Sequence, residues 1–179
     1  MRAYMAIETG EFRRLIETHQ RMVFSIALRI IGDFATAQEV AQDVFLVLHR
    51  SGERLTSEDH TRFWLRRVTV HRATDALRRR AVRPETRADE WTEELHGGGA
   101  GANGSVVGME ARIDDVLRLL PESQRVAIVL RYQEDLLPDE IALTLGQPVA
   151  TVKTHLRRGL ELLRRRAAIT LKEYVRGTT

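Results

Sequence analysis

The sequence predicts an all-α protein made of two small helical domains that are joined by a flexible linker. Apolar residues recur at three- and four-residue spacing along most of the chain, whereas long alternating runs of β-branched residues are absent. The chain has 179 residues, of which 43% are hydrophobic and 30% charged, as expected for a soluble protein with real cores. A glycine-rich stretch separates two blocks that each have helical periodicity.

The first long helix is expected from about Gly10 to Gly32. Gly32 ends the periodic pattern, and Asp33 opens a turn. The inward face combines apolar residues with one histidine at helical spacing: Leu15, Ile16, His19, Val23, Ile26, Ala27 and Ile30.

A second helix is expected from about Thr36 to Arg50. Thr36 and Glu39 have capping-box spacing, in which each side chain accepts a hydrogen bond from a free amide at the helix start. One face is apolar, with Phe45 at its edge: Val40, Val44, Val47 and Leu48. The other face is polar and mostly acidic: Gln38, Glu39, Gln42, Asp43 and Arg50. This polar face is either a solvated surface or a docking surface for a partner helix.

A polar loop, 51–60, precedes a third helix that is expected from Thr61 to Arg80. Its inward face has Trp64, Leu65, Val68, Ala73 and Leu77, and the rest is a basic band: Arg62, Arg66, Arg67, His71, Arg72, Arg78, Arg79 and Arg80. Cations beside an aromatic ring suit melted or single-stranded nucleic acid, because the ring offers a stacking platform. Two alternatives stay open: Trp64 packs in the core, and the last three arginines complement the helix dipole.

Residues 81–108 break the helical pattern. They contain several acids followed by HGGGAGANGSVVG, and such glycine-rich sequence buries too little apolar surface to offset its ordering entropy. We expect a flexible linker that separates an N-terminal domain, 10–80, from a C-terminal domain, 109–170. The glycines do not form a phosphate-binding loop, because no GKS or GKT sequence follows them.

The C-terminal domain begins with two expected helices. The first spans 109–120, with Ile113, Val116, Leu117 and Leu120 facing inward. The second starts at Pro121 and is mostly apolar in its middle: Val126, Ile128, Val129, Leu130 and Tyr132.

A helix-turn-helix is expected to follow. Proline suits the first position of a short helix over Pro138–Leu145, and Gly146 suits a left-handed C-cap. Pro148 prevents this helix from continuing, so a second helix is expected from about Val149 to Arg166. A short tail, 170–179, would end the chain.

The second helix of this pair has a buried stripe and a cationic face. The stripe comprises Val149, Val152, Leu156, Leu160 and Leu163, and the other face Thr151, Lys153, Thr154, His155, Arg157 and Arg158. Such side chains reach base edges and phosphates from the major groove. The alternative is an ordinary bundle with solvated cations. The charge distribution favours DNA binding by this helix. From Ala150 onward the chain has eight Lys and Arg residues and two acidic residues, whereas 109–148 has four Lys and Arg residues and eight acidic ones.

Composition excludes several classes of protein. The chain has no cysteine, which rules out disulfides and thiolate sites and fits a reducing cytoplasm. The six histidines lack metal-ligand spacing, and no catalytic motif is present, so we expect no metal, no cofactor and no enzymatic activity. No apolar run reaches membrane-spanning length and the N-terminus lacks a signal-peptide core, so we expect a cytoplasmic protein without membrane insertion.

Three segments in this order resemble bacterial sigma factors of the extracytoplasmic-function type (group 4), which keep only regions two and four of the larger sigma factors. GDFATAQEVAQDVFLVLHR is similar to the helix that grips core RNA polymerase, and WLRRVTVHRATDALRRR to the promoter-melting helix. LPESQRVAIVLRY, DEIALTLG and QPVATVKTHLRR are similar to region four almost throughout. The resemblance covers roughly residues 11–80 and 109–166.

The resemblance implies a transcription initiation factor that binds core RNA polymerase, directs it to a two-part promoter and helps to melt the minus-ten element. The polymerase would be docked by Glu39, Gln42, Asp43, Phe45 and Leu48. The minus-ten element would be met by the loop 51–60 and by Trp64, Arg67, His71, Arg72, Arg78 and Arg79. The minus-thirty-five element would be read by Thr151, Lys153, Thr154, His155, Arg157 and Arg158. The resemblance also implies an anti-sigma partner and a chain that is monomeric when free.

Four positions depart from the family's pattern. His71 stands where the family usually has Asn, and Thr61 where it often has Phe; Ala150 replaces a common Gly, and His155 a common Arg. These departures bear on the preferred promoter sequence and not on the class.

Two other classes of protein agree less well with the sequence than a sigma factor does. A stand-alone helix-turn-helix regulator that binds DNA as a dimer would leave the acidic helix and the basic band unexplained. An enzyme with an unrecognised carboxylate site has no motif to support it.

Overall fold

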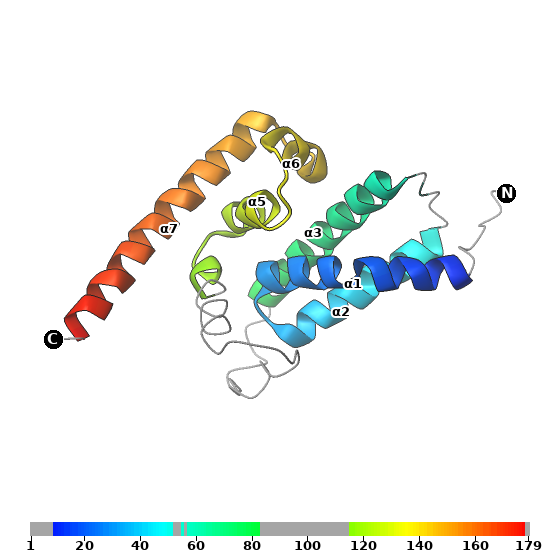
Figure 1. The fold of residues 1–179 in the computed structure, drawn as a ribbon, viewed down its shortest axis with the longest axis horizontal. Coiled ribbons are helices and arrows are strands. Elements are labelled where there is room, and N and C mark those ends of the chain that lie inside the picture. Colours follow the sequence, from blue (N-terminus) through cyan, green and yellow to red (C-terminus); the bar gives the residue numbers. More distant parts are fainter. Residues whose placement is uncertain (1–8, 52–54, 56, 83–114, 178–179) are drawn as a thin grey trace.

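The computed structural model describes residues 9–51, 55, 57–82 and 115–177, apart from the side chains of Ser51, Val82 and residues beyond 166. These residues are mostly helical, with no strand among them, which confirms the all-α prediction (Figure 1). The helices are α1 (Thr9–Ile31), α2 (Phe34–Ser51), α3 (Glu58–Val82), α5 (Glu122–Tyr132), α6 (Pro138–Leu145) and α7 (Val149–Gly177), with a further helical turn at 115–118. None of the described helices is long and apolar enough to cross a membrane.

Helices α1, α2 and α3 pack against one another as an N-terminal bundle (Figure 1). The apolar stripes that the sequence predicts for them point into its core, where several side chains are fully buried: Val23, Ile26, Ile30, Val44, Leu48 and Leu65. Burial of one such side chain stabilises the fold by about 1.5–3 kcal/mol. His19 of α1 is also buried, as the periodicity predicts.

The starts of α2 and α3 differ from the predicted positions. The Asp33 carboxylate accepts a hydrogen bond from the Thr36 amide at 2.9 Å, so Asp33 caps α2 and the prediction that Thr36 caps it was wrong. Ser57 Oγ accepts one from the His60 amide at 3.1 Å, so α3 begins at Glu58 and not at Thr61. Thr61 is therefore inside the helix, where its side chain is buried.

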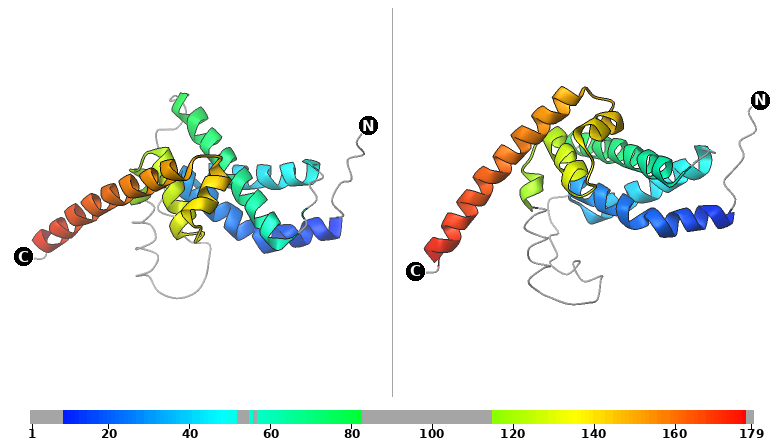
Figure 2. Two further views of the ribbon diagram at one scale, coloured as in Figure 1. Left: turned by 90° about the horizontal axis from the view of Figure 1, so that it is seen from above. Right: turned by 45° about the horizontal axis from the view of Figure 1, so that its top comes forward.

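Helices α5, α6 and α7 form a C-terminal bundle (Figure 2). The short α6 ends at Gly146, whose φ of 63° is the left-handed conformation that the sequence predicts there. At the other end of α6, a Glu140 carboxylate oxygen accepts a hydrogen bond from the Leu137 amide at 2.7 Å. The backbone of α7 continues to Gly177, so the prediction of a separate tail over 170–179 was wrong for 170–177.

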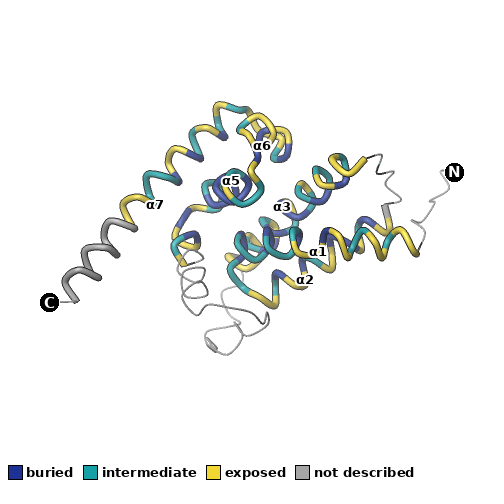
Figure 3. The backbone as a smooth tube through the Cα atoms, in the orientation of Figure 1, coloured by how far each residue is buried: buried dark blue, intermediate teal, exposed yellow. Residues whose placement is uncertain are grey.

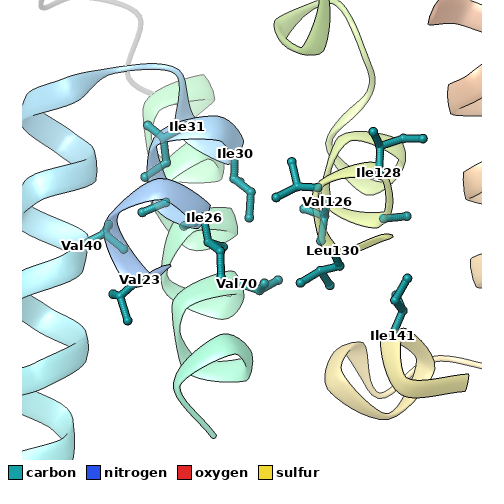
Figure 4. Close-up of a cluster of buried hydrophobic side chains, with 14 of the residues drawn as sticks. Val23, Ile26, Ile30, Ile31, Val40, Val70, Val126, Ile128, Leu130 and Ile141 are labelled. Carbon is teal, nitrogen blue, oxygen red and sulfur yellow. The ribbon is translucent and has the colours of Figure 1, made fainter. Parts of the chain in front are cut away.

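The two bundles meet in one continuous apolar cluster. Figure 4 shows Ile26, Ile30 and Val70 of the N-terminal bundle pointing toward Val126 and Leu130 of α5. We call the contact around these five residues the interdomain interface. Helix α5 lies between the N-terminal bundle and α7, and most of its residues are buried (Figure 3). The predicted linker, 81–108, lies outside the described residues from position 83, and α3 includes its first two positions.

Candidate nucleic-acid interface

The outward face of α7 carries the residues predicted to read DNA. Buried Val152 and Leu156 fix the rotation of the helix against the rest of the bundle. Lys153, Arg157 and Arg158 are consequently exposed, while the other predicted contacts are half-buried at the margins of the face: Thr151, Thr154 and His155. The structure thus gathers all six predicted residues on one surface of one helix.

The arginines on this face are held only weakly by the protein itself. Arg157 Nη1 lies 2.9 Å from Glu161 Oε1, one turn along α7, and both side chains are largely exposed. An exposed pair of this kind stabilises a helix by about 0.3–0.5 kcal/mol. The Arg157 guanidinium can therefore exchange this carboxylate for a phosphate at small cost. Thr154 is more constrained, because its hydroxyl donates to the Ala150 carbonyl oxygen at 2.9 Å.

The turn between α6 and α7 sets the angle between the two helices. Gly146 reverses the chain in the left-handed conformation, and the Gln147 amide donates to the Ala142 carbonyl oxygen at 3.0 Å. Pro148 follows, and its carbonyl oxygen accepts the first hydrogen bond of α7 from the Thr151 amide at 2.9 Å. Fully buried Ile141 anchors α6 in the apolar cluster. This is the helix-turn-helix that the sequence predicts.

The residues predicted for the minus-ten element occupy two stripes of α3. Arg67, His71 and Arg78 are exposed and follow one another at helical spacing. Arg79 is also exposed, and Arg72 is half-buried. Trp64 is partly buried and packs against the apolar cluster. Its ring therefore contributes to the core and is also partly exposed beside the basic residues.

One shielded ion pair of α3 was not predicted from the sequence. Arg66 Nε lies 2.9 Å from Glu134 Oε2, and the two side chains are only 16% and 8% exposed. Glu134 follows α5, 68 positions further along the chain. No local pattern indicates this pair, because the two residues meet only when the two bundles pack together.

The polar face of α2 is present, but it differs in part from the predicted docking surface. Glu39, Gln42 and Asp43 are exposed on one stripe. Phe45 and Leu48 are 7% and 0% exposed, so they hold α2 in the bundle and do not reach its surface.

Leu46 is the exposed apolar residue of this face of α2. It stands seven positions after Glu39 and completes the i, i+3, i+4, i+7 stripe that Gln42 and Asp43 belong to. Its side chain is 48% exposed, which leaves apolar surface in contact with water. The helical spacing could have found Leu46, which the apolar pattern of α2 alone did not separate from Val47 and Leu48.

Among the residues that the structure describes, the two groups with shifted pKa values are buried and lie away from these faces. Burial lowers the pKa of His19, and Glu58, whose Oε1 lies 3.7 Å from Nε2, opposes this only in part. Burial also lowers the pKa of Arg125, and nearby Arg118 adds to the effect. Among the described residues, no group of three His, Asp or Glu side chains could hold a metal ion. The exposed faces thus offer cations, donors and one acidic stripe, which suit binding rather than catalysis.

Comparisons with known proteins agree with this geometry. The family model described as Sigma-70 region 2 matches residues 15–83, and the one described as Sigma-70, region 4 matches residues 110–163. Together the two matched segments span more than half of the chain. The first contains α2 and α3, and the second contains α5, α6 and the cationic part of α7.

Curated relatives share most of their length with this chain. It is 29% identical to RNA polymerase sigma-E factor of Streptomyces coelicolor, over 88% of this chain and 86% of that protein. It is 26% identical to the ECF RNA polymerase sigma factor SigW of Bacillus subtilis, over 86% of this chain and 87% of that protein.

Two solved structures have the same fold. The sigma factor RpoE of Bartonella quintana, solved with the anti-sigma factor NepR, aligns with a TM-score of 0.65 at 16% identity, over 88% of this chain and 96% of that one. CnrH, solved with the cytosolic domain of CnrY, aligns with a TM-score of 0.63 at 21% identity, over 90% of both chains. The chain therefore belongs to the sigma-70 family and is an extracytoplasmic-function sigma factor, a non-enzymatic initiation factor that directs RNA polymerase to promoters.

Proposed function

We propose that this chain is a group 4 sigma factor that acts in the cytoplasm with two DNA-reading surfaces and one polymerase-docking surface. Residues 10–80 and 109–170 form the two working domains, and 81–108 is the tether between them. The outward face of α7 reads the minus-thirty-five element. The basic stripe of α3 meets the minus-ten element and helps to melt it. Helix α2 docks on core RNA polymerase.

The α2 stripe is the observation that carries the proposal. Glu39, Gln42 and Asp43 form an exposed polar stripe that ends at the exposed apolar side chain of Leu46. Protein–protein contacts combine apolar side chains with polar and charged ones in this way. A stand-alone regulator that binds DNA as a dimer would use α7 but would leave this stripe of α2 without a role.

The proposal assigns Phe45 and Leu48 a supporting role. Both are buried against the bundle, and they fix the direction in which Asp43 and Leu46 point. Replacing either of the buried residues would disturb α2 itself, so the docking test is placed on the exposed residues.

A second part of the proposal concerns an anti-sigma partner. The structures of RpoE and CnrH with which this chain shares its fold contain bound partners, NepR and the cytosolic domain of CnrY. We infer that the present chain is also controlled by a protein that binds it and keeps it from core polymerase. Co-purification of such a protein from the native cells, released when polymerase is added in excess, would support this part.

Capture by core RNA polymerase tests the docking surface. We expect Asp43→Lys to keep the helicity and Tm of the wild-type chain, because exposed substitutions usually change stability by less than about 0.5 kcal/mol. The variant should not be captured by polymerase. We expect Asp43 to face cations of the polymerase, and a lysine placed against like charges in an interface costs several kcal/mol. Leu46→Ser should weaken capture without altering charge.

Glu17→Lys is the matched control, because it makes the same change of charge at an exposed position of α1. Wild-type capture by a folded Asp43→Lys variant would contradict the docking surface. Failure of the unaltered chain to bind any core polymerase, together with tight binding to DNA alone, would favour the stand-alone regulator.

A further inference from the structure

We propose that Arg164 and Arg165 form a phosphate-binding site that holds the DNA backbone beside the minus-thirty-five element, outside the base pairs that α7 reads. The proposal rests on the proposed role of α7 at that element. It goes beyond this role because it adds two residues to the DNA surface, and because it adds flanking DNA that is bound whatever its sequence.

The cationic face of α7 is longer than the groove that it would enter. Arg164 and Arg165 are exposed, and each stands seven positions after another exposed arginine, Arg157 or Arg158, and so lies on the same face. From Lys153 to Arg165 is twelve positions, or about 18 Å along a helix. The major groove is only about 12 Å wide, and a recognition helix contacts base edges with its N-terminal residues. A helix that enters the groove in this way carries Arg164 and Arg165 to the phosphates at the edge of the groove.

The helix itself does not account for these two arginines. Cations near a helix C-terminus complement the helix dipole, but this effect is confined to the last turn. Helix α7 continues to Gly177, about three turns beyond Arg165. Glu161 is the one acid among the described side chains of α7, and it lies 2.9 Å from Arg157. A ligand that carries several negative charges, such as a DNA backbone, does account for a cationic face of this length.

Apolar packing fixes the direction in which the two arginines point. Gly159 lies so close to α5 that a Cβ there would be 3.0 Å from Ile128 Cγ1. Leu160 and Leu163 are partly buried and pack against the apolar cluster, so the anchored part of α7 reaches the turn that carries Arg164. Beyond this turn the helix projects away from the other helices (Figure 1). Because the arginines belong to a continuous, anchored helix, DNA binding requires little ordering of the backbone.

The chemistry of the two side chains identifies the ligand. The planar donors of a guanidinium match the oxygens of a phosphate. Consecutive residues of a helix point about 100° apart, so Arg164 and Arg165 suit two phosphates of one backbone rather than a single ion. Phosphates are the same at every base pair, so the site adds affinity without base preference.

The first test measures the salt dependence of promoter binding. Core RNA polymerase carrying this chain is bound to a promoter fragment that it transcribes, over a range of KCl concentrations. Arg164→Gln/Arg165→Gln removes both charges and keeps good helix-forming residues. Each phosphate contact releases about 0.9 ion, so the slope of log K against log salt should fall by about two, and affinity at 0.1 M salt roughly tenfold. Base changes inside the minus-thirty-five element should weaken the variant and the wild type by the same factor.

Two control variants separate the site from net charge and from folding. Arg14→Gln/Arg21→Gln removes two exposed arginines of α1 and should keep the wild-type slope. An equal fall of the slope in this control would overturn the proposal, because the effect would then be one of net charge. Arg164→Lys/Arg165→Lys retains the charges and should retain most of the slope.

The second test locates the contact on the DNA. Groups of three successive phosphates on either side of the minus-thirty-five element are replaced by neutral methylphosphonates. One group should weaken binding of the wild-type chain several-fold and leave binding of Arg164→Gln/Arg165→Gln unchanged. Each protein is compared with itself on unmodified DNA, so a partly unfolded variant cannot imitate this result. Equal losses for both proteins at every group would overturn the proposal.

The outcomes also separate this site from the function on which it rests. A wild-type slope in Arg164→Gln/Arg165→Gln, together with altered promoter binding by Lys153→Ala, would overturn only the phosphate site. Unaltered promoter binding in both variants would overturn the DNA-reading role of α7 and the phosphate site with it. Capture by core polymerase through α2 is measured independently of both.

Discussion

Replacement of Arg125 should destabilise the whole molecule more than replacement of any exposed arginine. The side chain is 9% exposed, and its guanidinium donates to the carbonyl oxygens of Ile30 at 2.6 Å, Arg118 at 2.8 Å and Leu120 at 3.1 Å. Burial lowers its pKa, but an arginine remains charged at any ordinary pH. One cation thus satisfies three backbone acceptors, and one of these belongs to the other bundle.

The expected loss for Arg125→Met follows from these contacts. Each hydrogen bond from a charged donor contributes about 1.5–3 kcal/mol, and the substitution leaves buried carbonyls without a partner. Methionine avoids the cost of burying a charge and restores part of this loss. We expect the free energy of unfolding to fall by about 2–4 kcal/mol, within the range of large single-residue effects.

Urea unfolding measures this change, with Arg21→Met as the matched control on the exposed side of α1. Arg125→Lys should be almost as damaging as Arg125→Met, because a single ammonium cannot reproduce the fork of guanidinium donors. An unfolding free energy for Arg125→Met within about 0.5 kcal/mol of wild type, the range of exposed substitutions, would refute the reasoning.

Three further predictions concern other parts of the structure. Gly159→Val should lower stability by about 1–3 kcal/mol in thermal unfolding, since even its Cβ would lie 3.0 Å from Ile128 Cγ1; an unchanged Tm would mean that α7 moves freely on α5. Burial lowers the pKa of His19, so the unfolded chain binds more protons than the folded one below the ordinary histidine pKa of about 6.5. The free energy of unfolding should therefore fall as the pH drops below that value. A His19→Gln variant should lose less stability over the same pH range, and equal losses would exclude His19 as the cause. Lys153→Ala or Arg158→Ala should reduce the salt dependence of promoter binding by about one ion each if the side chain contacts phosphate, or relax one base preference by ~1–3 kcal/mol if it reads a base; no change in either quantity would remove both residues from the DNA surface.

The helices and the helix-turn-helix could be predicted from the sequence because their causes are local. The stripe from His19 to Ile30 repeats within a single helix, and the glycine at 146 acts at the end of one helix. The predicted starts of α2 and α3 were less accurate, because several nearby residues can cap a helix. Asp33 and Ser57 act as caps in the structure, whereas the capping-box spacing pointed to Thr36.

The interdomain interface could not be predicted, because its partners are far apart in the sequence. Arg66 and Glu134 are separated by 68 positions, and Arg125 and Ile30 by 95. In the sequence, Arg66 is one member of a basic band and Arg125 is one charge in an apolar helix. Periodicity places each residue on a face of its own helix, but only tertiary packing determines which two faces meet.

The exposed polar stripe of α2 was predicted from the sequence, but the exposure of its apolar residues was not. Apolar residues run without a break from Val44 to Leu48, so the apolar pattern alone does not separate core positions from surface positions. The structure buries Phe45 and Leu48 and leaves Leu46 exposed beside Asp43. The contribution of each residue to docking stays a prediction until polymerase capture is measured.

Transcription from genomic DNA fragments by purified core RNA polymerase, with and without this chain, tests most directly whether the two DNA-reading surfaces work together in one initiation factor. We predict discrete transcripts that require the chain, with footprints on two separate promoter elements and melting only at the downstream one. Base changes in the upstream element should alter the response to Lys153→Ala or Arg158→Ala, and base changes in the downstream element the response to Arg67→Ala or Arg78→Ala. The absence of chain-dependent transcripts, together with a footprint of the chain alone on a palindromic site, would contradict the assignment.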